Sequence, residues 1–343
     1  MLYYIYKICP RVHIREVRRL VTKEDVARAA GVSTATVTRV LYGKGYVSEK
    51  AKRRVLEAVA ELKYHPNKVA SNLAKNRSNV IGVLVEDLVN SYYTQIVEAM
   101  AVRASELDSI VSIFVVKNKA MQPVLDDLIG NRVCGVVNLA MFTCGEEHLK
   151  QLHDVGIRVY NFTDEDSRFV KVDYRPGMDQ ALELLESKGH RNVAFAAGLE
   201  ETLSGKDFRV RRFLERRREL GFSEDDRLLR YADYPKEKAP KVGYDMTISL
   251  LEQGIPFDAM FCLTDMMAMG AIKALTERGL RVPKDVSLIG CDNLEFTGYF
   301  APALTTIDVD KELHGRAYVD SILGVEKGEV LIPSSLVIRE SVR

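Results

Sequence analysis

The sequence has little that would tie the protein to a membrane, a disulfide framework or a metal. It contains no tryptophan and only five cysteines among 343 residues. The cysteines are scattered, odd in number and without metal-ligand spacing, which argues against a secreted disulfide scaffold and a metal site. No apolar run approaches the roughly 18 residues of a membrane span, and the segment up to Pro10 has no small-residue cleavage site of a signal peptide. We therefore expect a cytoplasmic protein without membrane contact or cofactor.

The motifs of common enzyme classes are also missing. There is no Gly-x-x-x-x-Gly-Lys loop, no His-Glu-x-x-His and no Gly-x-Ser-x-Gly. An enzyme needs a nucleophile and base, a phosphate loop or a metal cluster. Asp265 and Asp292 could act as acid and base, but no activated partner accompanies them. We predict that the protein is not an enzyme.

The N-terminal part of the chain is poor in negative charge, and the remainder has an excess of it. Residues 1–79 contain 17 Lys and Arg against 6 Asp and Glu, a net charge of +11, whereas residues 80–343 contain 32 against 42, a net charge of −10. A segment this basic is typical of a nucleic-acid partner, although basic tails also occur as solvated arms. The residue pattern inside the segment distinguishes a nucleic-acid-binding domain from a solvated tail.

The basic segment has the pattern of a helix-turn-helix. Thr22 and Ser33 are each suited to cap a helix, with Asp25 completing an imperfect capping box after the first. Gly31 between them suits the left-handed residue that ends a helix. The second helix, residues 34–41, has a small polar outer face, as a helix that reads DNA requires.

A third helix is predicted from Ser48 to about Tyr64, which would complete a three-helix domain. The residues expected to face its core are Val55, Leu56, Val59, Ala60 and Leu62. The plain alternative is a three-helix bundle whose basic face is merely solvated.

The runs from Asp25 to Ser33 (DVARAAGVS) and from Thr36 to Leu41 (TVTRVL) closely resemble the LacI family of bacterial transcription regulators. The resemblance implies a recognition helix in the major groove of an operator. The residues that it places against DNA are Ser33, Thr34, Ala35, Thr38 and Arg39. Short side chains there suit thymine methyl groups, and the arginine suits guanine or a phosphate.

The family resemblance continues into a hinge segment that orders on the operator. It implies DNA contacts at Asn67, Ala70 and Leu73, with Leu73 wedged between base pairs in the minor groove. Ser71-Asn72 replaces the arginine that usually follows the alanine. Packing of Leu73 against the body of the protein is the alternative. Family members usually begin near Val21, so we expect translation to start there, and the intact mass of the native protein tests this.

From Val80 onward, short β-branched runs alternate with amphipathic helical stretches. The predicted strands are 80–85, 110–116, 135–139, 158–161, 193–197, 228–231, 259–263 and 286–291, and the predicted helices include 93–107 and 178–188. This alternation predicts parallel sheets with helical crossovers. About 260 residues exceed one such unit, so two lobes are expected, with a ligand between them at the carboxyl ends of the strands.

The LacI-type resemblance extends over this part and implies an effector domain similar to periplasmic sugar-binding proteins. Its motifs occur in family order and end in a terminal strand at Leu336–Ser341. The residues expected to bind an effector are Tyr92, Tyr93, Arg209, Asp265, Asp292 and, with a looser alignment, Tyr234. Aromatic faces, an arginine and carboxylates together suit a polyhydroxylated ring.

The expected fold is therefore α/β: an N-terminal three-helix helix-turn-helix domain plus a two-lobed, periplasmic-binding-protein-like effector domain with parallel sheets. The expected divisions are residues 1–20 (extension), 21–64 (DNA binding), 65–79 (hinge) and 80–343 (effector binding and dimerisation). Lobe 1 would take residues 80–173 and 308–332, and lobe 2 would take 174–307 and 333–343.

The expected function is a repressor that binds a palindromic operator in double-stranded DNA as a homodimer, under control of a small molecule, expected to be a sugar. Ser91, Thr264, Arg212 and Asn293 depart from the usual family residues and leave the effector open. A purine- or nucleoside-responsive regulator is one alternative. A solute-binding protein without a regulatory role is another, although it should be exported and lack the basic helices.

Overall fold

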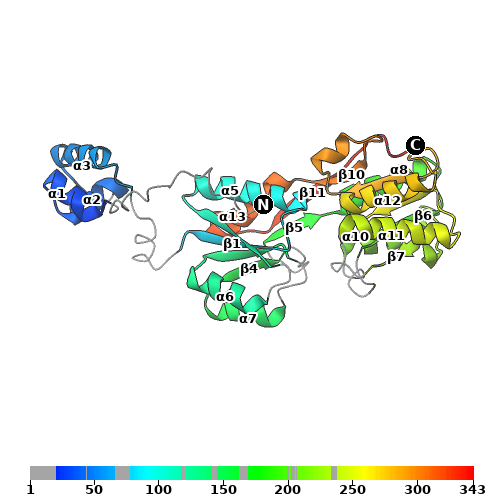
Figure 1. Ribbon diagram of the computed structural model, residues 1–343, viewed down its shortest axis with the longest axis horizontal. Coiled ribbons are helices and arrows are strands. Elements are labelled where there is room, and N and C mark those ends of the chain that lie inside the picture. Colours follow the sequence, from blue (N-terminus) through cyan, green and yellow to red (C-terminus); the bar gives the residue numbers. More distant parts are fainter. Residues whose placement is uncertain are drawn as a thin grey trace, which may run out of the picture. The chain divides into compact units, whose positions relative to one another are not determined.

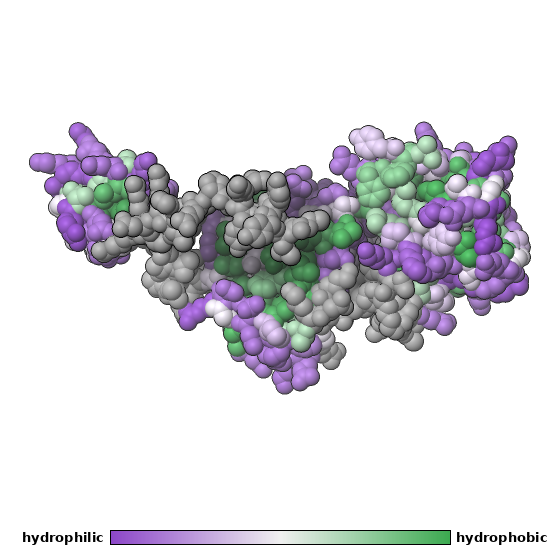
Figure 2. Space-filling view, in the orientation of Figure 1, coloured by the Kyte–Doolittle hydropathy of each residue, from purple (hydrophilic) through white to green (hydrophobic). Residues whose placement is uncertain are grey.

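The computed structural model of the protein describes residues 21–43, 45–65, 78–116, 120–140, 145–161, 169–198, 201, 205, 207–232 and 238–343. The chain divides into two units, Met1–Asn76 and Arg77–Arg343. The helices of the first unit are α1 (Lys23–Ala30), α2 (Thr34–Tyr42) and α3 (Glu49–Glu61). Figure 2 shows hydrophilic residues over much of the visible face of this unit, with an apolar area between the helices.

Local capping sets the ends of these helices. The Thr22 hydroxyl accepts a hydrogen bond from the Asp25 amide, and the Asp25 carboxylate accepts one from the Thr22 amide. Asp25 therefore completes the capping box, although its side chain is shorter than the usual Glu. Gly31 ends α1 with φ of 62°, a left-handed conformation that glycine adopts at no steric cost. The sequence therefore places the tight turn between α1 and α2 by itself.

The core of this unit is formed by Val26, Val37 and Val55, which are fully buried. The expectation that Leu56 and Ala60 face this core is wrong, because Leu56 is 49% exposed and Ala60 is also exposed. The buried positions of α3 follow a spacing of three and four residues, and Leu56 lies about 100° around the helix from Val55.

The second unit is built on two sheets. A four-stranded sheet has the order β2-β1-β3-β4, and a seven-stranded sheet has the order β5-β11-β10-β9-β8-β6-β7. The strands are β1 (Val80–Val85), β2 (Ile110–Val115), β3 (Gly135–Asn138), β4 (Arg158–Asn161), β5 (Val170–Asp173), β6 (Val193–Ala196), β7 (Leu229–Arg230), β8 (Ala259–Cys262), β9 (Ser287–Cys291), β10 (Thr305–Val309) and β11 (Val330–Val337).

Helices cover both sheets (Figure 1). They are α5 (Ser91–Glu106), α6 (Met121–Gly130), α7 (Glu146–Asp154), α8 (Arg175–Ser187), α10 (Phe208–Glu219), α11 (Ala239–Glu252), α12 (Asp265–Glu277) and α13 (Lys311–Leu323), with short 3₁₀ turns at Asp226–Leu228 and Glu295–Gly298. In the first lobe α5 packs against α13, and in the second lobe α11 packs against α12. Two α/β lobes therefore make up this unit.

Among the described residues, all strand pairs but one are parallel. β11 runs parallel to β5 at its beginning and antiparallel to β10 at its end, where Thr306 pairs with Val337. The terminal strand also begins earlier than the predicted Leu336–Ser341 and ends at Val337. Val170 and Ile332, at the β5 end of this sheet, are buried in the core of the first lobe, whereas β6, β8 and β9 are buried in the second. The seven-stranded sheet thus spans both lobes.

The helices of the described residues include none that is long and apolar enough to cross a membrane. Within the same residues, no group of three or more His, Cys, Asp or Glu side chains is arranged to hold a metal ion.

Candidate functional site

The first turn of α2 carries the residues expected to read DNA. Ser33 is its N-cap, and its hydroxyl accepts a hydrogen bond from the Thr36 amide at 3.2 Å. Thr38 donates from its hydroxyl to the Thr34 carbonyl at 2.9 Å. Since Ser33 and Thr38 are engaged in holding the helix, their hydroxyl groups are less available for a base than the sequence alone suggests.

Ala35 and Arg39 are both exposed and lie one helical turn apart on α2. A short and a long side chain on one face suit the edge of a base pair and a phosphate or guanine beside it. Tyr42 (42% exposed) and Tyr46 (91% exposed) follow, at and beyond the end of α2. Neither tyrosine is among the residues expected to contact DNA.

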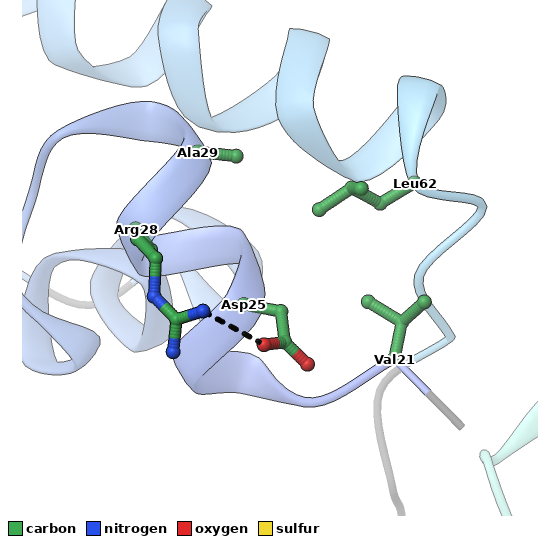
Figure 3. Close-up of a pocket in the computed structure, with 5 residues that line it drawn as sticks. All are labelled: Val21, Asp25, Arg28, Ala29 and Leu62. Atoms are coloured by element: carbon green, nitrogen blue, oxygen red, sulfur yellow. Dashed lines mark ion pairs between the residues drawn. The ribbon is translucent and has the colours of Figure 1, made fainter. Parts of the chain in front are cut away.

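A recess in this unit lies between α1 and the end of α3 (Figure 3). It is lined by Val21, Asp25, Arg28, Ala29 and Leu62, with Asp25 and Arg28 paired at 3.7 Å. None of these residues belongs to α2, so the recess does not contribute to the face that carries Ala35 and Arg39. Four predicted site residues, Asn67, Ala70, Leu73 and Tyr234, lie outside the described residues.

In the second unit, Asp292 directly follows β9 in a strained turn. Asp292 has φ of 126° and Asn293 has φ of 49°, both in a region that L-residues rarely adopt. The Asp292 side chain is buried, and within the described residues its Oδ2 has no hydrogen-bond partner. Burial, followed by the charge of Asp265, raises the pKa of Asp292 well above its usual range. A buried carboxyl oxygen without a partner is costly unless something else binds it.

The surroundings of the turn hold it in this conformation. The Asp292 amide donates to the Ile307 carbonyl at 2.9 Å, and the Asn293 amide donates to the Thr306 hydroxyl at 3.2 Å. Arg339 donates to the Asn293 side-chain oxygen at 2.6 Å. Strain of this kind persists only where neighbouring contacts determine the conformation, and it is concentrated at functional sites.

Asp265, at the start of α12, lies behind the turn. Its two oxygens accept hydrogen bonds from the Thr306 hydroxyl at 2.5 Å and the Leu294 amide at 2.8 Å, and its side chain is fully buried. Burial raises the pKa of Asp265 to about 6. These bonds make Asp265 a support for the turn, and direct contact with an effector remains a prediction.

Arg209 lies in the first turn of α10 beside Tyr174. It pairs with Asp207 at 2.8 Å, donates to the Leu263 carbonyl at 3.1 Å, and its guanidinium carbon lies 4.7 Å from the centre of the Tyr174 ring. Burial would raise the pKa of Asp207, but the Arg209 charge outweighs burial and holds it below its usual value. Arg209 is therefore a fixed donor.

Tyr92, on α5 of the first lobe, lies near these residues of the second lobe. Asn90 caps α5 by accepting from the Tyr92 amide at 3.0 Å, and the Tyr92 ring is buried edge-to-face against Tyr93 at 5.5 Å. Burial, followed by Tyr174 and Asp292, raises the pKa of Tyr92 well above its usual range. Tyr92 is therefore within electrostatic reach of Asp292, which the second lobe supplies.

The structure thus brings together Tyr92, Arg209 and Asp292 around Tyr174, with Tyr93 beside them and Asp265 behind. Two members were missed by sequence analysis. Tyr174 follows β5, a strand that was not predicted. Lys311, the first residue of α13, lies with its Nζ 5.7 Å from the centre of the Tyr92 ring. Aromatic rings, fixed donors and a carboxyl with one oxygen that has no partner among the described residues suit a small ligand with hydroxyl groups.

The chain is similar to known proteins over nearly its whole length. The model for bacterial regulatory proteins of the lacI family matches residues 22–67, and the model for a periplasmic binding protein-like domain matches residues 182–342. The lactose operon repressor of Escherichia coli K12 is 33% identical over 339 residues, covering 94% of this chain and 90% of that protein.

Solved structures agree with this match. A Lac repressor dimer bound to operator and the anti-inducer ONPF superposes with a TM-score of 0.78 at 30% identity, covering 94% of this chain and 99% of that one. The complex of the transcriptional regulator CelR with cellobiose has a TM-score of 0.67 at 26% identity, covering 94% and 99%.

Proposed function

The chain belongs to the LacI family of bacterial regulatory proteins, and on that premise we propose that it is a repressor controlled by a sugar bound at Asp292 between its two lobes. Members of this family are DNA-binding repressors with an effector domain, and they are not enzymes. Beyond family membership, the proposal names the effector class and the residues that bind it.

The observation that carries the effector site is the unpartnered Oδ2 of Asp292. A neutral polyhydroxylated ring supplies a hydroxyl donor to this oxygen and acceptors to Arg209, whose charge Asp207 already balances. Arg209 and Lys311 each have a carboxylate partner, so neither of these two cations calls for an acidic effector. The CelR complex with cellobiose adds support from a related protein.

For DNA binding, we propose that two copies of the chain pair and place two α2 helices on a palindromic operator. The exposed Ala35 and Arg39 read base edges, assisted by Thr34, and Leu73 wedges the minor groove. Residues 21–64 form the DNA-binding domain, 65–79 the hinge, and 80–343 the effector and dimerisation domain. With DNA as its partner, the protein acts in the cytoplasm.

The effector site is tested by thermal unfolding against a panel of neutral sugars, sugar acids, nucleosides and purine bases. A ligand that binds only the folded state stabilises it by about 2.7 kcal/mol at a hundredfold excess over its Kd. We expect neutral sugars to raise the Tm of the wild type and Asp292→Asn to reduce that rise, whereas Asp245→Asn, on the exposed side of α11, leaves it unchanged. A nucleoside or purine hit, with no sugar hit, contradicts the proposed effector class.

The DNA-binding part is tested by selecting preferred sequences from random duplexes. Ala35→Gln should change the selected operator, because an amide in place of a methyl group favours adenine at the position that it faces. Leu73→Ala should weaken binding to the selected operator more than binding to random DNA. If both variants keep the wild-type sequence profile and lose affinity equally on all DNA, neither residue reads the operator.

A further inference from the structure

Asp308, near the end of β10, joins two walls of the effector site through one atom. Its Oδ1 accepts a hydrogen bond from Nδ2 of Asn293 at 3.1 Å and another from Nζ of Lys311 at 3.0 Å. Asn293 belongs to the strained turn that presents Asp292, and Lys311 is the first residue of α13. Leu294, next in the chain, is itself buried in the core of the first lobe. The shared oxygen therefore links the turn after β9 to a helix of the first lobe.

Lys311 has an unusual position for a cation. Its side chain is only 8% exposed, and it lies at the N-terminal end of a helix, where the backbone dipole disfavours positive charge. A buried ammonium group has to be paired and hydrogen-bonded. Besides Asp308, it donates to the Val309 carbonyl at 2.9 Å and faces the Tyr92 ring. Asp308 is thus the only carboxylate among the described residues that is ion-paired with Lys311.

The helix that begins at Lys311 is tightly joined to α5. A Cβ on Gly315 would lie 2.5 Å from the Ile96 carbonyl oxygen, so the two backbones are in close contact. Arg103 of α5 pairs with Asp320 of α13 at 2.8 Å. Because such packing resists gradual deformation, a displacement of the first turn of α13 is passed to α5 as a unit. α5 carries Tyr92 and follows β1, the first strand after the hinge segment in the sequence.

We propose that Asp308 is a positioning residue that transmits the state of the Asp292 turn to the α5–α13 pair. When the turn moves, the Asn293 amide changes its bond to Asp308, and the carboxylate shifts its remaining interaction with Lys311. This inference rests on the proposed function, since an effector bound at Asp292 would use the link to reach the first lobe. No covalent step is involved.

The test needs neither effector nor DNA and uses hydrogen–deuterium exchange on the full chain. Asp292→Asn perturbs the turn and tolerates its positive φ. In the otherwise wild-type chain, we expect it to change amide exchange in residues 311–316 by roughly fivefold or more, the lower end of typical allosteric coupling. In an Asp308→Ala background the same substitution should leave residues 311–316 unchanged.

Three further variants keep the result interpretable. Asp308→Asn preserves the side-chain shape and an acceptor oxygen, so the exchange response of residues 311–316 should be partly present in it. This variant also replaces Asp308→Ala in the test if the alanine variant folds poorly. Lys311→Met should abolish the response without altering the turn, whereas Lys273→Met, on the exposed side of α12, should preserve it. An equal response with and without the Asp308 carboxylate, or no response in either, overturns the inference. Operator selection and the sugar panel are unaffected by that outcome, so the proposed function would stand.

Discussion

At the scale of single residues, Asp265 and Asp292 show how two buried aspartates near one turn differ in role. Asp265 accepts hydrogen bonds from Thr306 and Leu294 and has no exposed surface. Asp292 has one oxygen without a partner among the described residues and a strained backbone. A carboxyl whose bonds are satisfied within the protein supports structure, whereas an unsatisfied one is available to a ligand.

The raised pKa of Asp265, about 6, predicts a pH dependence of stability. Between about pH 4 and 6 the folded protein keeps a proton that the unfolded chain releases, so the stability that this residue contributes is full below about pH 4 and is lost as the pH rises through 6. The free energy of unfolding of the wild type, relative to Asp265→Asn, should therefore fall by roughly 2–3 kcal/mol from pH 4 to 7.5. Burial also raises the pKa of Asp292, so its contribution to stability changes with pH in the same direction.

Urea unfolding at several pH values measures this difference. Asp245→Asn, on the surface of α11, serves as the matched control, and its difference from the wild type should stay nearly constant. A wild-type advantage over Asp265→Asn that grows with pH would show that Asp265 is charged at little cost in the folded state.

At the scale of elements, the pair α5–α13 is the most closely packed feature of the first lobe. Gly315 allows the helices to approach, and two ion pairs, Arg103–Asp320 and Arg316–Glu106, flank the contact. α5 carries Tyr92 and α13 carries Lys311, whose Nζ lies 5.7 Å from the centre of the Tyr92 ring, so the geometry of this pair sets two walls of the proposed effector site together. We therefore expect a change in the packing of these helices to alter effector binding.

Gly315→Ala should destabilise the protein by about 1–3 kcal/mol, because the added Cβ would overlap the Ile96 carbonyl. Without that overlap, Gly to Ala in a helix gains up to about 1 kcal/mol. Gly130→Ala, at the end of α6, meets no atom within 4 Å and should be neutral or slightly stabilising. Thermal unfolding of the two variants measures this difference. Equal Tm values would mean that α5 and α13 separate without cost in stability.

At the scale of the whole molecule, the N-terminal part of the chain and the rest carry opposite net charges. The net charge of +11 on residues 1–79 and −10 on residues 80–343 concentrates attraction for DNA in the N-terminal part. At the proposed effector site, in contrast, Asp207 pairs with Arg209 and Asp308 pairs with Lys311. The two binding activities should therefore respond differently to salt.

Operator binding should weaken by roughly 10³- to 10⁵-fold between 50 and 200 mM salt if about 6–10 phosphates are contacted. Sugar binding should change little over the same range, because a neutral ligand releases no counterions. Fluorescence anisotropy with labelled DNA and calorimetry with the sugar measure the two dependences. Operator affinity that is insensitive to salt would mean that the basic segment does not contact the phosphate backbone.

Sequence reasoning was most successful where the determining interactions are local. Thr22, Gly31 and Ser33 fix the ends of α1 and α2 through their own backbone contacts, and short β-branched runs gave β1 and β4 at the observed residues. Leu56 was misplaced because helical spacing alone permits a stripe on either side of Val55, and the contacts of α1 with α3 select one. β5 was missed because a four-residue strand beside β11 depends on a partner more than 150 residues away.

The sequence by itself determined the family, the helix-turn-helix and the two α/β lobes, because capping residues, periodicity and charge act over a few residues or add over a whole segment. Only the tertiary structure decided which aspartate has all its oxygens hydrogen-bonded, that Tyr174 lies against Arg209 and Lys311 faces Tyr92, and that one oxygen of Asp308 accepts from both Asn293 and Lys311. These features depend on residues far apart in the chain meeting where strands end, and hydrogen bonding at such a point is set by geometry that no local pattern encodes.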